Sequence, residues 1–280
     1  MDISKSNIIK SILNIVNSDL KTNYNIRKVN RVSDEGKEFE NFIKDSFANS
    51  FKKKKKEKYW KKVFSYLGSI NNPPDIMIKD GDAIEIKKTI SDTADIHLNS
   101  SQPKSILKSS DKRIKEDCRK CEEWSEKDLI YIIGTIKKKT LTSISMIYGD
   151  CLFADNDYYD EKIKPIVDTI KQSDLDLSET QELGRINKVD QLGVSSLRIR
   201  GMWIFQNPRK VFKELKLFSK KNTFELFCIM KRSKFESMPD KDKKKIIGLK
   251  NSNLQIKDVN IKDPNDKNKQ IDCKLISYII

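Results

Sequence analysis

The chain lacks the features that would place it in a membrane or divide it into separate parts. No apolar run approaches the roughly 18 residues of a membrane-spanning helix, and the N-terminus has neither the basic region nor the cleavage site of a signal peptide. No linker rich in Gly, Ser or Pro isolates a segment, and no internal repeat is visible. These absences predict a cytoplasmic protein without a membrane partner, folded as one domain over residues 1–280.

Cysteine and histidine are also scarce, with 5 Cys and 1 His. An odd number of cysteines fits a compartment in which thiols stay reduced. Cys118 and Cys121 have the spacing of half a zinc site, but no second Cys-x2-Cys pair follows. Cys151 and His97 are unconnected candidates for completing such a site. The sequence therefore favours buried thiols and leaves open whether Cys118 and Cys121 bind a metal.

Positive charge is what the chain has in excess. Its 56 Lys and Arg against 41 Asp and Glu give a formal charge of +15, and from Asn207 to the end 19 Lys and Arg against 9 Asp and Glu leave +10. This excess of positive charge favours duplex DNA as the partner, because lysine and arginine neutralise the DNA phosphates and release counterions. We predict a basic C-terminal extension, about residues 211–280, that packs on the core and helps clasp DNA. A basic protein with no such partner is the alternative.

The segment Asn72–Lys88, NPPDIMIKDGDAIEIKK, has the most informative pattern. Apolar and other residues alternate around Asp80-Gly81 with the period of a strand buried on one face. A two-residue turn would mix polar and apolar residues on each face. A three-residue loop, with Gly81 in the left-handed conformation, instead pairs Asp75 with Glu85. That register buries four isoleucines, Ile76, Ile78, Ile84 and Ile86.

The same register places two carboxylates and a lysine on the opposite face, which suits phosphodiester hydrolysis. That reaction needs a divalent cation to neutralise charge on the scissile phosphate and to lower the pKa of the attacking water. Because Mg²⁺ takes oxygen ligands, Asp75 and Glu85 are the predicted ligands, with the Ile86 carbonyl as a third. Lys87 is predicted to orient or help deprotonate the water. A surface hairpin that merely has a charged face is the alternative.

Pro74-Asp75, nine residues and then Glu85-Ile86-Lys87 is similar to the PD-(D/E)xK nuclease signature. Six ordered blocks, spanning most of residues 30 to 212, extend the likeness to the NgoPII-type family of type II restriction endonucleases. The blocks are NPPDIMIKDGDAIEIKK, LNSSQPK (98–104), CRKCEEW (118–124), KDLIYIIG (127–134), SETQELGRINKVDQLG (178–193) and LRIRGMWIFQNP (197–208). The resemblance implies Mg²⁺-dependent cleavage of both DNA strands at a short palindrome, GGCC or a related GC-rich site. It also implies a homodimer that acts beside a cognate methyltransferase.

The order of elements and the resemblance together predict an α/β fold, a mixed central sheet flanked by helices with its PD-(D/E)xK core in about residues 30–210. Ile8, Ile12, Ile15 and Val16 recur at helical spacing and predict a first helix. A second is predicted from near Ser33 with Phe39, Ile43 and Phe47 facing inward, and a third at 159–171 with an interruption at Pro165. Strands are predicted at 127–136 and 141–149.

In this fold a helix before the catalytic hairpin often supplies a third acidic residue. Glu40 is the predicted match, with Glu35 and Glu38 as alternatives, and a solvated helix face would explain any of the three. Its role would be secondary, steadying Lys87 or a water in the site.

Two other blocks contain candidate DNA contacts. LNSSQPK is predicted to be a loop, from Asn99, that leads into a short helix capped by Ser100 or Ser101, with amides and Lys104 free for a phosphate. A plain capping role would explain the serines equally well.

Arg198 and Arg200 stand two apart, so in a strand they share one face while Leu197, Ile199 and Trp203 pack behind them. An arginine can donate to O6 and N7 of one guanine, and a guanine-containing site would use that contact. Arg185 is a weaker candidate. The alternative is a pair that forms salt bridges or binds phosphate. Two other functions also remain open: a PD-(D/E)xK nuclease of repair or recombination that reads DNA structure, and a basic DNA-binding protein without catalysis.

Overall fold

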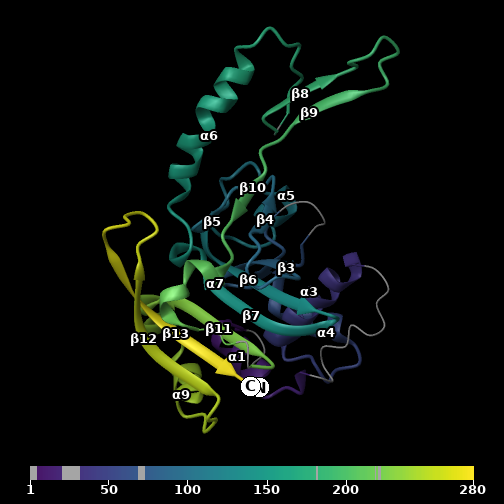
Figure 1. Cartoon of the computed structure of the whole chain (residues 1–280). Helices are drawn as coiled ribbons and strands as arrows, with labels where there is room; N and C mark the ends of the chain where they lie inside the picture. The colour runs from purple at the N-terminus through teal and green to yellow at the C-terminus, as the bar shows by residue number, and fades with distance from the viewer. Residues whose placement is uncertain (1–4, 21–31, 69–72, 181, 218, 220–221) are drawn as a thin grey trace.

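The computed structural model describes residues 5–20, 32–68, 73–180, 182–217, 219 and 222–280. Within them the main element is a mixed nine-stranded sheet in the order β1-β2-β3-β6-β7-β11-β13-β12, with β5 paired to β6 beside this path (Figure 1). β3 runs parallel to β6 and β7 to β11, whereas the other neighbours are antiparallel. The predicted α/β fold with a mixed central sheet is confirmed.

The strands of this sheet are β1 (Phe64–Tyr66), β2 (Ile76–Ile78), β3 (Ala83–Thr89), β5 (Ile106–Lys108), β6 (Glu126–Lys137), β7 (Thr140–Tyr148), β11 (Glu225–Lys231), β12 (Leu254–Lys262) and β13 (Gln270–Ile279). Two smaller pairs lie outside it, β4 (Ile96–Asn99) with β10 (Trp203–Phe205) and β8 (Gly184–Asn187) with β9 (Ser196–Ile199). The described helices are α1 (Ile8–Val16), α3 (Val32–Ala48), α4 (Lys56–Val63), α5 (Glu116–Arg119), α6 (Asn156–Lys171), α7 (Pro208–Val211), α8 (Arg232–Ser237) and α9 (Asp240–Ile247), with 3-10 turns η2 (Gly149–Cys151) and η3 (Lys213–Leu215).

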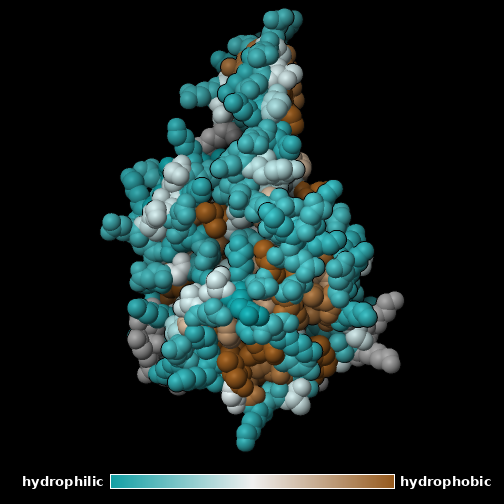
Figure 2. All heavy atoms as spheres, turned by 90° about the vertical axis from the view of Figure 1, so that its left-hand side faces the viewer, coloured by the Kyte–Doolittle hydropathy of each residue, from teal (hydrophilic) through white to brown (hydrophobic). Residues whose placement is uncertain are grey.

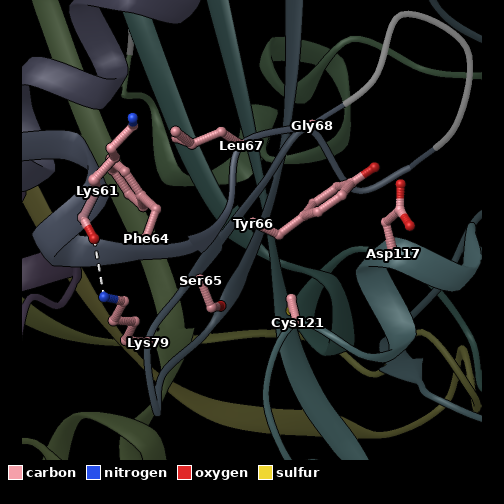
Figure 3. A pocket seen from close by; sticks show the side chains of 9 residues that line it. All are labelled: Lys61, Phe64, Ser65, Tyr66, Leu67, Gly68, Lys79, Asp117 and Cys121. Carbon is pink, nitrogen blue, oxygen red and sulfur yellow. Dashed lines mark hydrogen bonds between the residues drawn. The ribbon is translucent and has the colours of Figure 1, made fainter. Parts of the chain in front are cut away.

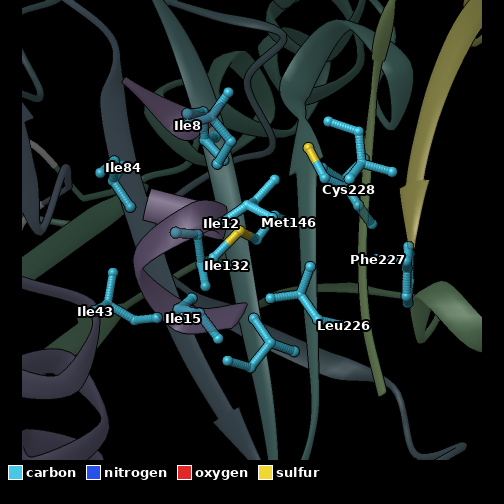
Figure 4. Close-up of a cluster of buried hydrophobic side chains, with 14 of the residues drawn as sticks. Ile8, Ile12, Ile15, Ile43, Ile84, Ile132, Met146, Leu226, Phe227 and Cys228 are labelled. Atoms are coloured by element: carbon cyan, nitrogen blue, oxygen red, sulfur yellow. The ribbon is translucent and has the colours of Figure 1, made fainter. Parts of the chain in front are cut away.

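The helices α1 and α3 pack on one face of the sheet, as their apolar spacing predicts. Ile8, Ile12 and Ile15 of α1 lie against isoleucines of β3 and β6, and Ile43 of α3 joins the same cluster (Figure 4). The Asn7 side chain begins α1 by accepting a hydrogen bond from the backbone N–H of Lys10 at 3.0 Å. The strands at 127–136 and 141–149 are likewise confirmed as β6 and β7.

A second buried cluster covers the opposite face of β2, β3 and β6. Its members come from these strands and from the segments that cross over them, namely Tyr66, Met77, Ala83, Ile96, Leu98, Leu107, Ile114, Cys118, Leu129, Tyr131, Ile133, Phe153 and Phe205. The hairpin of β2 and β3 is therefore covered on both faces.

The helix α6 and the β8–β9 hairpin project from the body as an arm, seen above the sheet in Figure 1. The predicted interruption of α6 at Pro165 is wrong, because the helix is continuous from Asn156 to Lys171. Proline removes one N–H from the helical ladder, which leaves the carbonyl of Glu161 unpaired within the helix. Glu161 is exposed, so water can satisfy that carbonyl. No described helix is both long and apolar enough to cross a membrane.

The last quarter of the chain continues the same sheet. β11 lies between β7 and β13, so the basic C-terminal segment supplies internal strands as well as surface. A hydrogen bond of 2.8 Å from the Asn7 amide to Asp242 also joins α1 to α9. That this segment helps clasp DNA stays a prediction.

Gly134 of β6 is where α3 approaches the sheet most closely. A Cβ added there would lie 2.6 Å from two ring atoms of Phe39, whereas a Cβ at Gly36, within α3 itself, would meet nothing within 4 Å. We therefore expect Gly134→Ala to lower the free energy of unfolding by about 1–3 kcal/mol through overpacking. Gly36→Ala should raise it by up to about 1 kcal/mol through helix propensity. Urea denaturation of both variants measures the difference, and equal effects would contradict the predicted contact.

Candidate active site

The catalytic hairpin has the register that its sequence predicts. Ile76 pairs with Ile84 and Met77 with Ala83, which sets Asp75 opposite Glu85. The Ile78 N–H donates to the Asp82 carbonyl at 3.0 Å and closes the three-residue loop. All four isoleucines are buried.

One detail of the turn differs from the prediction. Asp80, with φ of 51°, adopts the left-handed conformation, and Gly81 does not. Aspartate tolerates this region because its short polar side chain can bond locally. Gly81 is needed for a different reason: a Cβ there would lie 3.0 Å from Cγ2 of Ile78.

Partly buried ion pairs and hydrogen bonds hold the turn end of the hairpin. Lys234 of α8 donates to Asp82 at 2.7 Å and also contacts Asp128, while the Tyr148 hydroxyl donates to the second Asp82 oxygen at 2.7 Å. On the other side Lys127 donates to the Gly81 carbonyl at 2.7 Å. The C-terminal segment thus fixes the strand that carries Glu85 and Lys87.

Asp75, Glu85 and Lys87 meet at one end of this hairpin. Lys87 Nζ lies 2.6 Å from Glu85 Oε1, and Asp75 Oδ2 accepts a hydrogen bond of 2.6 Å from the Ile86 N–H. Glu85 is only 4% exposed. Among the described residues, its Oε2 is a buried oxygen that has no hydrogen-bond partner.

The two carboxyl groups repel each other. Burial and the charge of Glu85 raise the pKa of Asp75 to about 8, against the lowering effects of Lys87 and of the Ile86 N–H. Burial alone would lower the pKa of Lys87, but the charges of Glu85 and Asp75 outweigh it and raise that pKa.

These observations fit a divalent cation. The buried Oε2 of Glu85 has no hydrogen-bond partner in the part of the chain that the structure describes, and the raised pKa of Asp75 means that this carboxyl group resists ionisation. Two carboxylate ligands of a metal ion are expected to show both features when no cation balances their charge. No group of three or more His, Cys, Asp and Glu side chains suited to a metal occurs among the described residues. Mg²⁺ does not need one, because one or two carboxylates suffice when water and phosphate supply the other oxygens. The role of the Ile86 carbonyl stays a prediction.

The cysteines lie apart from this site. Cys118 Sγ is 3.1 Å from the sulfur of Met77, and Cys151 Sγ is 3.9 Å from that of Cys273. His97 is exposed on β4. Of the two candidates for completing a zinc site, Cys151 therefore contacts Cys273 and His97 faces solvent.

Of the three acidic candidates on α3, Glu40 is the one whose charge reaches the site. It adds to the raised pKa of Asp75 and forms an ion pair with Lys44. Glu35 instead pairs with Lys88 at 2.6 Å, and Glu38 is exposed. The supporting role of Glu40 stays a prediction.

Tyr131 is a neighbour of the site that the sequence did not single out. It lies directly across from Glu85 on β6, and its buried hydroxyl accepts a hydrogen bond of 3.1 Å from the Lys104 N–H. Burial and the charge of Glu85 raise its pKa well above the usual value. The signal was present in KDLIYIIG, because once β6 is paired with β3 in parallel, Tyr131 falls on the face of Glu85.

The predicted helix after LNSSQPK is wrong. Residues 101–104 are irregular and run into β5. The backbone N–H groups of Lys104 and Ser105 already donate hydrogen bonds to the Tyr131 hydroxyl and to the Asn156 side-chain oxygen, respectively. Lys104 is buried and its ammonium pairs with Asp111, so it is not free for a phosphate. Asn99 and Ser100 are exposed, and Ser101 is half-buried.

Arg198 and Arg200 lie on the arm and share one partner. Arg198 donates to Glu182 at 2.6 Å and Arg200 at 3.0 Å, so the salt-bridged alternative describes the protein without DNA. The predicted single strand is broken after Ile199, and Leu197 is exposed, so it does not pack behind the arginines. Arg185 lies directly opposite Arg198 across the β8–β9 pair.

An open pocket of about 530 Å³ lies beside β1 and is separate from this site (Figure 3). Its lining is Lys61, Phe64, Ser65, Tyr66, Leu67, Gly68, Lys79, Asp117 and Cys121. It contains none of the predicted catalytic side chains, so we do not assign the reaction to it.

The raised pKa of Asp75 makes stability depend on pH. Its ordinary value is 3.8, so between about pH 4 and 8 the folded chain holds this proton more tightly than the unfolded chain. The free energy of unfolding should therefore fall as pH rises, with a slope of at most about 1.4 kcal/mol per pH unit from this group. Urea denaturation at several pH values, with chelator present, measures the slope. Asp75→Asn should flatten it, and an unchanged slope would contradict the assignment.

A mixed sheet flanked by helices is consistent with a restriction-endonuclease-like fold, and two carboxylates and a lysine meet on one of its hairpins. The family model described as NgoPII restriction endonuclease matches residues 6–262. The chain is also 37% identical, over 97% of its own length and 99% of the relative's, to the type II restriction enzyme NgoPII of Neisseria gonorrhoeae. The chain therefore belongs to the NgoPII restriction endonuclease family, which confirms the predicted type II site-specific deoxyribonuclease class. No solved structure matches.

Proposed function

We propose that this enzyme cuts both strands of duplex DNA at a short palindrome, GGCC or a related GC-rich site, in a Mg²⁺-dependent reaction. The observation that carries the proposal is the register that brings Asp75 opposite Glu85, with Lys87 2.6 Å from Glu85. The protein would act as a homodimer in the cytoplasm, beside a methyltransferase that modifies the same site.

The residues have separate roles in this reaction. Asp75 and Glu85 would hold Mg²⁺, with the Ile86 carbonyl as a further oxygen, and the bound ion supplies charge neutralisation at the phosphate and an acidified water. Lys87 orients the attacking water or helps to deprotonate it. Glu40 steadies Lys87 or a water in the site.

Digestion of a supercoiled plasmid with Mg²⁺ tests the proposal. Discrete fragments whose sequenced ends share one palindrome are expected, and chelator should prevent them. A smear, or preference for branched DNA, would instead indicate a nuclease of repair or recombination. DNA binding without cleavage in Mg²⁺ or Mn²⁺ would indicate a DNA-binding protein without catalysis.

Recognition is proposed to involve Arg198 and Arg200, with Arg185 as a weaker contributor and with Asn99, Ser100 and Ser101 near the backbone. The loop and the arginines are connected, because Asn99 of β4 pairs with Trp203 of β10, just beyond Arg200. Lys104 joins this set only if its pair with Asp111 opens. Glu182 must likewise release or share its arginines when they donate to guanine.

Arg198→Lys or Arg200→Lys should reduce discrimination against a wrong base by about 1–3 kcal/mol, because lysine keeps the charge but lacks the planar fork. Affinity for random duplex should stay nearly constant. Binding to the true site, to single-base variants and to random duplex at two salt concentrations measures this. Arg232→Lys, which alters a surface pair with Asp258, is the control. Equal losses on specific and random DNA would exclude base readout by the pair.

A further inference from the structure

The tip of the arm is apolar and exposed. In the connection between β8 and β9, Leu192 is 86% exposed and Val194 is 82% exposed. Nearby, Val189 is 56% exposed and Leu197 is 50% exposed. Figure 2 shows apolar side chains along one edge of the projecting arm, whose remaining visible surface is mostly hydrophilic. A two-stranded hairpin is at best marginally stable alone in water, so an exposed apolar tip points to a covering surface.

A second apolar patch lies at the base of the same arm. Met202 is 61% exposed and Ile204 is 54% exposed. They are two residues apart at the start of β10, so they lie on one side of the chain. Each copy of the protein thus presents one apolar patch at the tip of the arm and one at its base.

Charge argues against DNA as the partner of the tip. Residues 188–197 contain one Lys and one Asp and are neutral, and residues 156–205 contain seven Lys and Arg against nine Asp and Glu, a charge of −2. The rest of the chain, with +15 overall, therefore has +17. A polyphosphate would not attract the neutral tip, whereas the basic body of a second copy, to which β10 and its apolar patch are joined through β4, complements the net charge of −2 on the arm.

We infer that the arm binds a second copy of this chain, its tip packing on the base patch of the partner's arm. The inference rests on the proposed homodimer and names its surface. Two such contacts related by a two-fold axis form a closed interface, since each copy contributes both patches. The arginine-bearing side of the hairpin remains available to DNA, because Arg185 and Arg198 alternate with Ile186 and Leu197 along their strands.

The oligomeric state of the full chain, measured by sedimentation without DNA or metal, tests the inference. The double variant Leu192→Ser/Val194→Ser and the single variant Met202→Ser should each weaken self-association by on the order of 10-fold or more. Ile247→Ser, at a similarly exposed position on α9 (65%), should leave it unchanged. Thermal unfolding of each variant checks that the fold is intact. Because the two variants change different segments of the chain, a local folding defect in one does not affect the association measured with the other.

Cleavage provides a second readout. On supercoiled plasmid the tip variant should accumulate nicked circles where the wild type yields linear product, because a monomer has one active site. A wild type that is monomeric at micromolar concentration would overturn the inference, as would unchanged association of either arm variant. So would loss of affinity for random duplex by the tip variant with unchanged association, which would assign the tip to DNA. If the wild type cuts no DNA, the proposed function fails while the sedimentation result still decides the interface.

Discussion

Asp75→Asn and Glu85→Gln are each expected to abolish DNA cleavage while DNA binding survives. Each amide keeps the shape of the side chain but removes one of two anionic oxygen ligands, and the metal charge that the reaction requires is then poorly held. Binding in chelator should stay the same or tighten, because a carboxylate near phosphate is repulsive. Single-turnover cleavage with Mg²⁺ and gel shifts without metal measure the two effects.

Asp266→Asn is the matched control for these substitutions. Asp266 pairs with Lys269 on the surface and lies outside the site, so the same chemical change should leave the rate unaltered. Full cleavage by either site variant would remove that residue from the metal site.

Lys87→Ala is expected to lower the cleavage rate by about 10²- to 10⁴-fold, the contribution typical of one positioned proton-transfer group. Binding of Mn²⁺ should change less, because Lys87 is not a ligand. Single-turnover rates and a metal titration measure both quantities.

The adjacent lysine offers a close comparison. Lys88 points away from Glu85 and pairs with Glu35, so Lys88→Met should retain far more activity than Lys87→Ala at a temperature where both are folded. If the two variants lose the same activity, the effect belongs to the charge of the strand and Lys87 has no special role.

The hairpin could be predicted because its sequence permits one solution. Alternating residues have period two, so a shift of one residue would expose every isoleucine, and only one loop length avoids that. The position of Asp75 opposite Glu85 follows from this constraint alone. The helices α1 and α3 were predictable for the same kind of reason, since Ile8, Ile12 and Ile15 mark a single helical face.

The errors arose where distant residues override local preference. The serines of LNSSQPK are good helix caps. The N–H groups of Lys104 and Ser105 nevertheless donate their hydrogen bonds to Tyr131 and Asn156, which lie on other elements. The pair of Lys104 with Asp111 and the shared partner of Arg198 and Arg200 depend on how loops meet in space. The spacing of residues along the chain does not report contacts between distant segments. The geometry of the hairpin was therefore predicted better than the surroundings of the proposed DNA-contact residues.

The position of β11 has a consequence for when the enzyme becomes complete. Asp75, Glu85 and Lys87 are synthesised early, but β7 remains an open edge until β11 emerges, and Lys234 reaches Asp82 only afterwards. Pairing strands so far apart in the chain requires closure of a long loop, which is slow. A nascent or truncated chain that ends before β11 thus carries the proposed catalytic side chains without the finished sheet that holds them. Under the proposed site assignment, the sheet around these residues is completed only when the last fifth of the chain, from β11 onward, has been made.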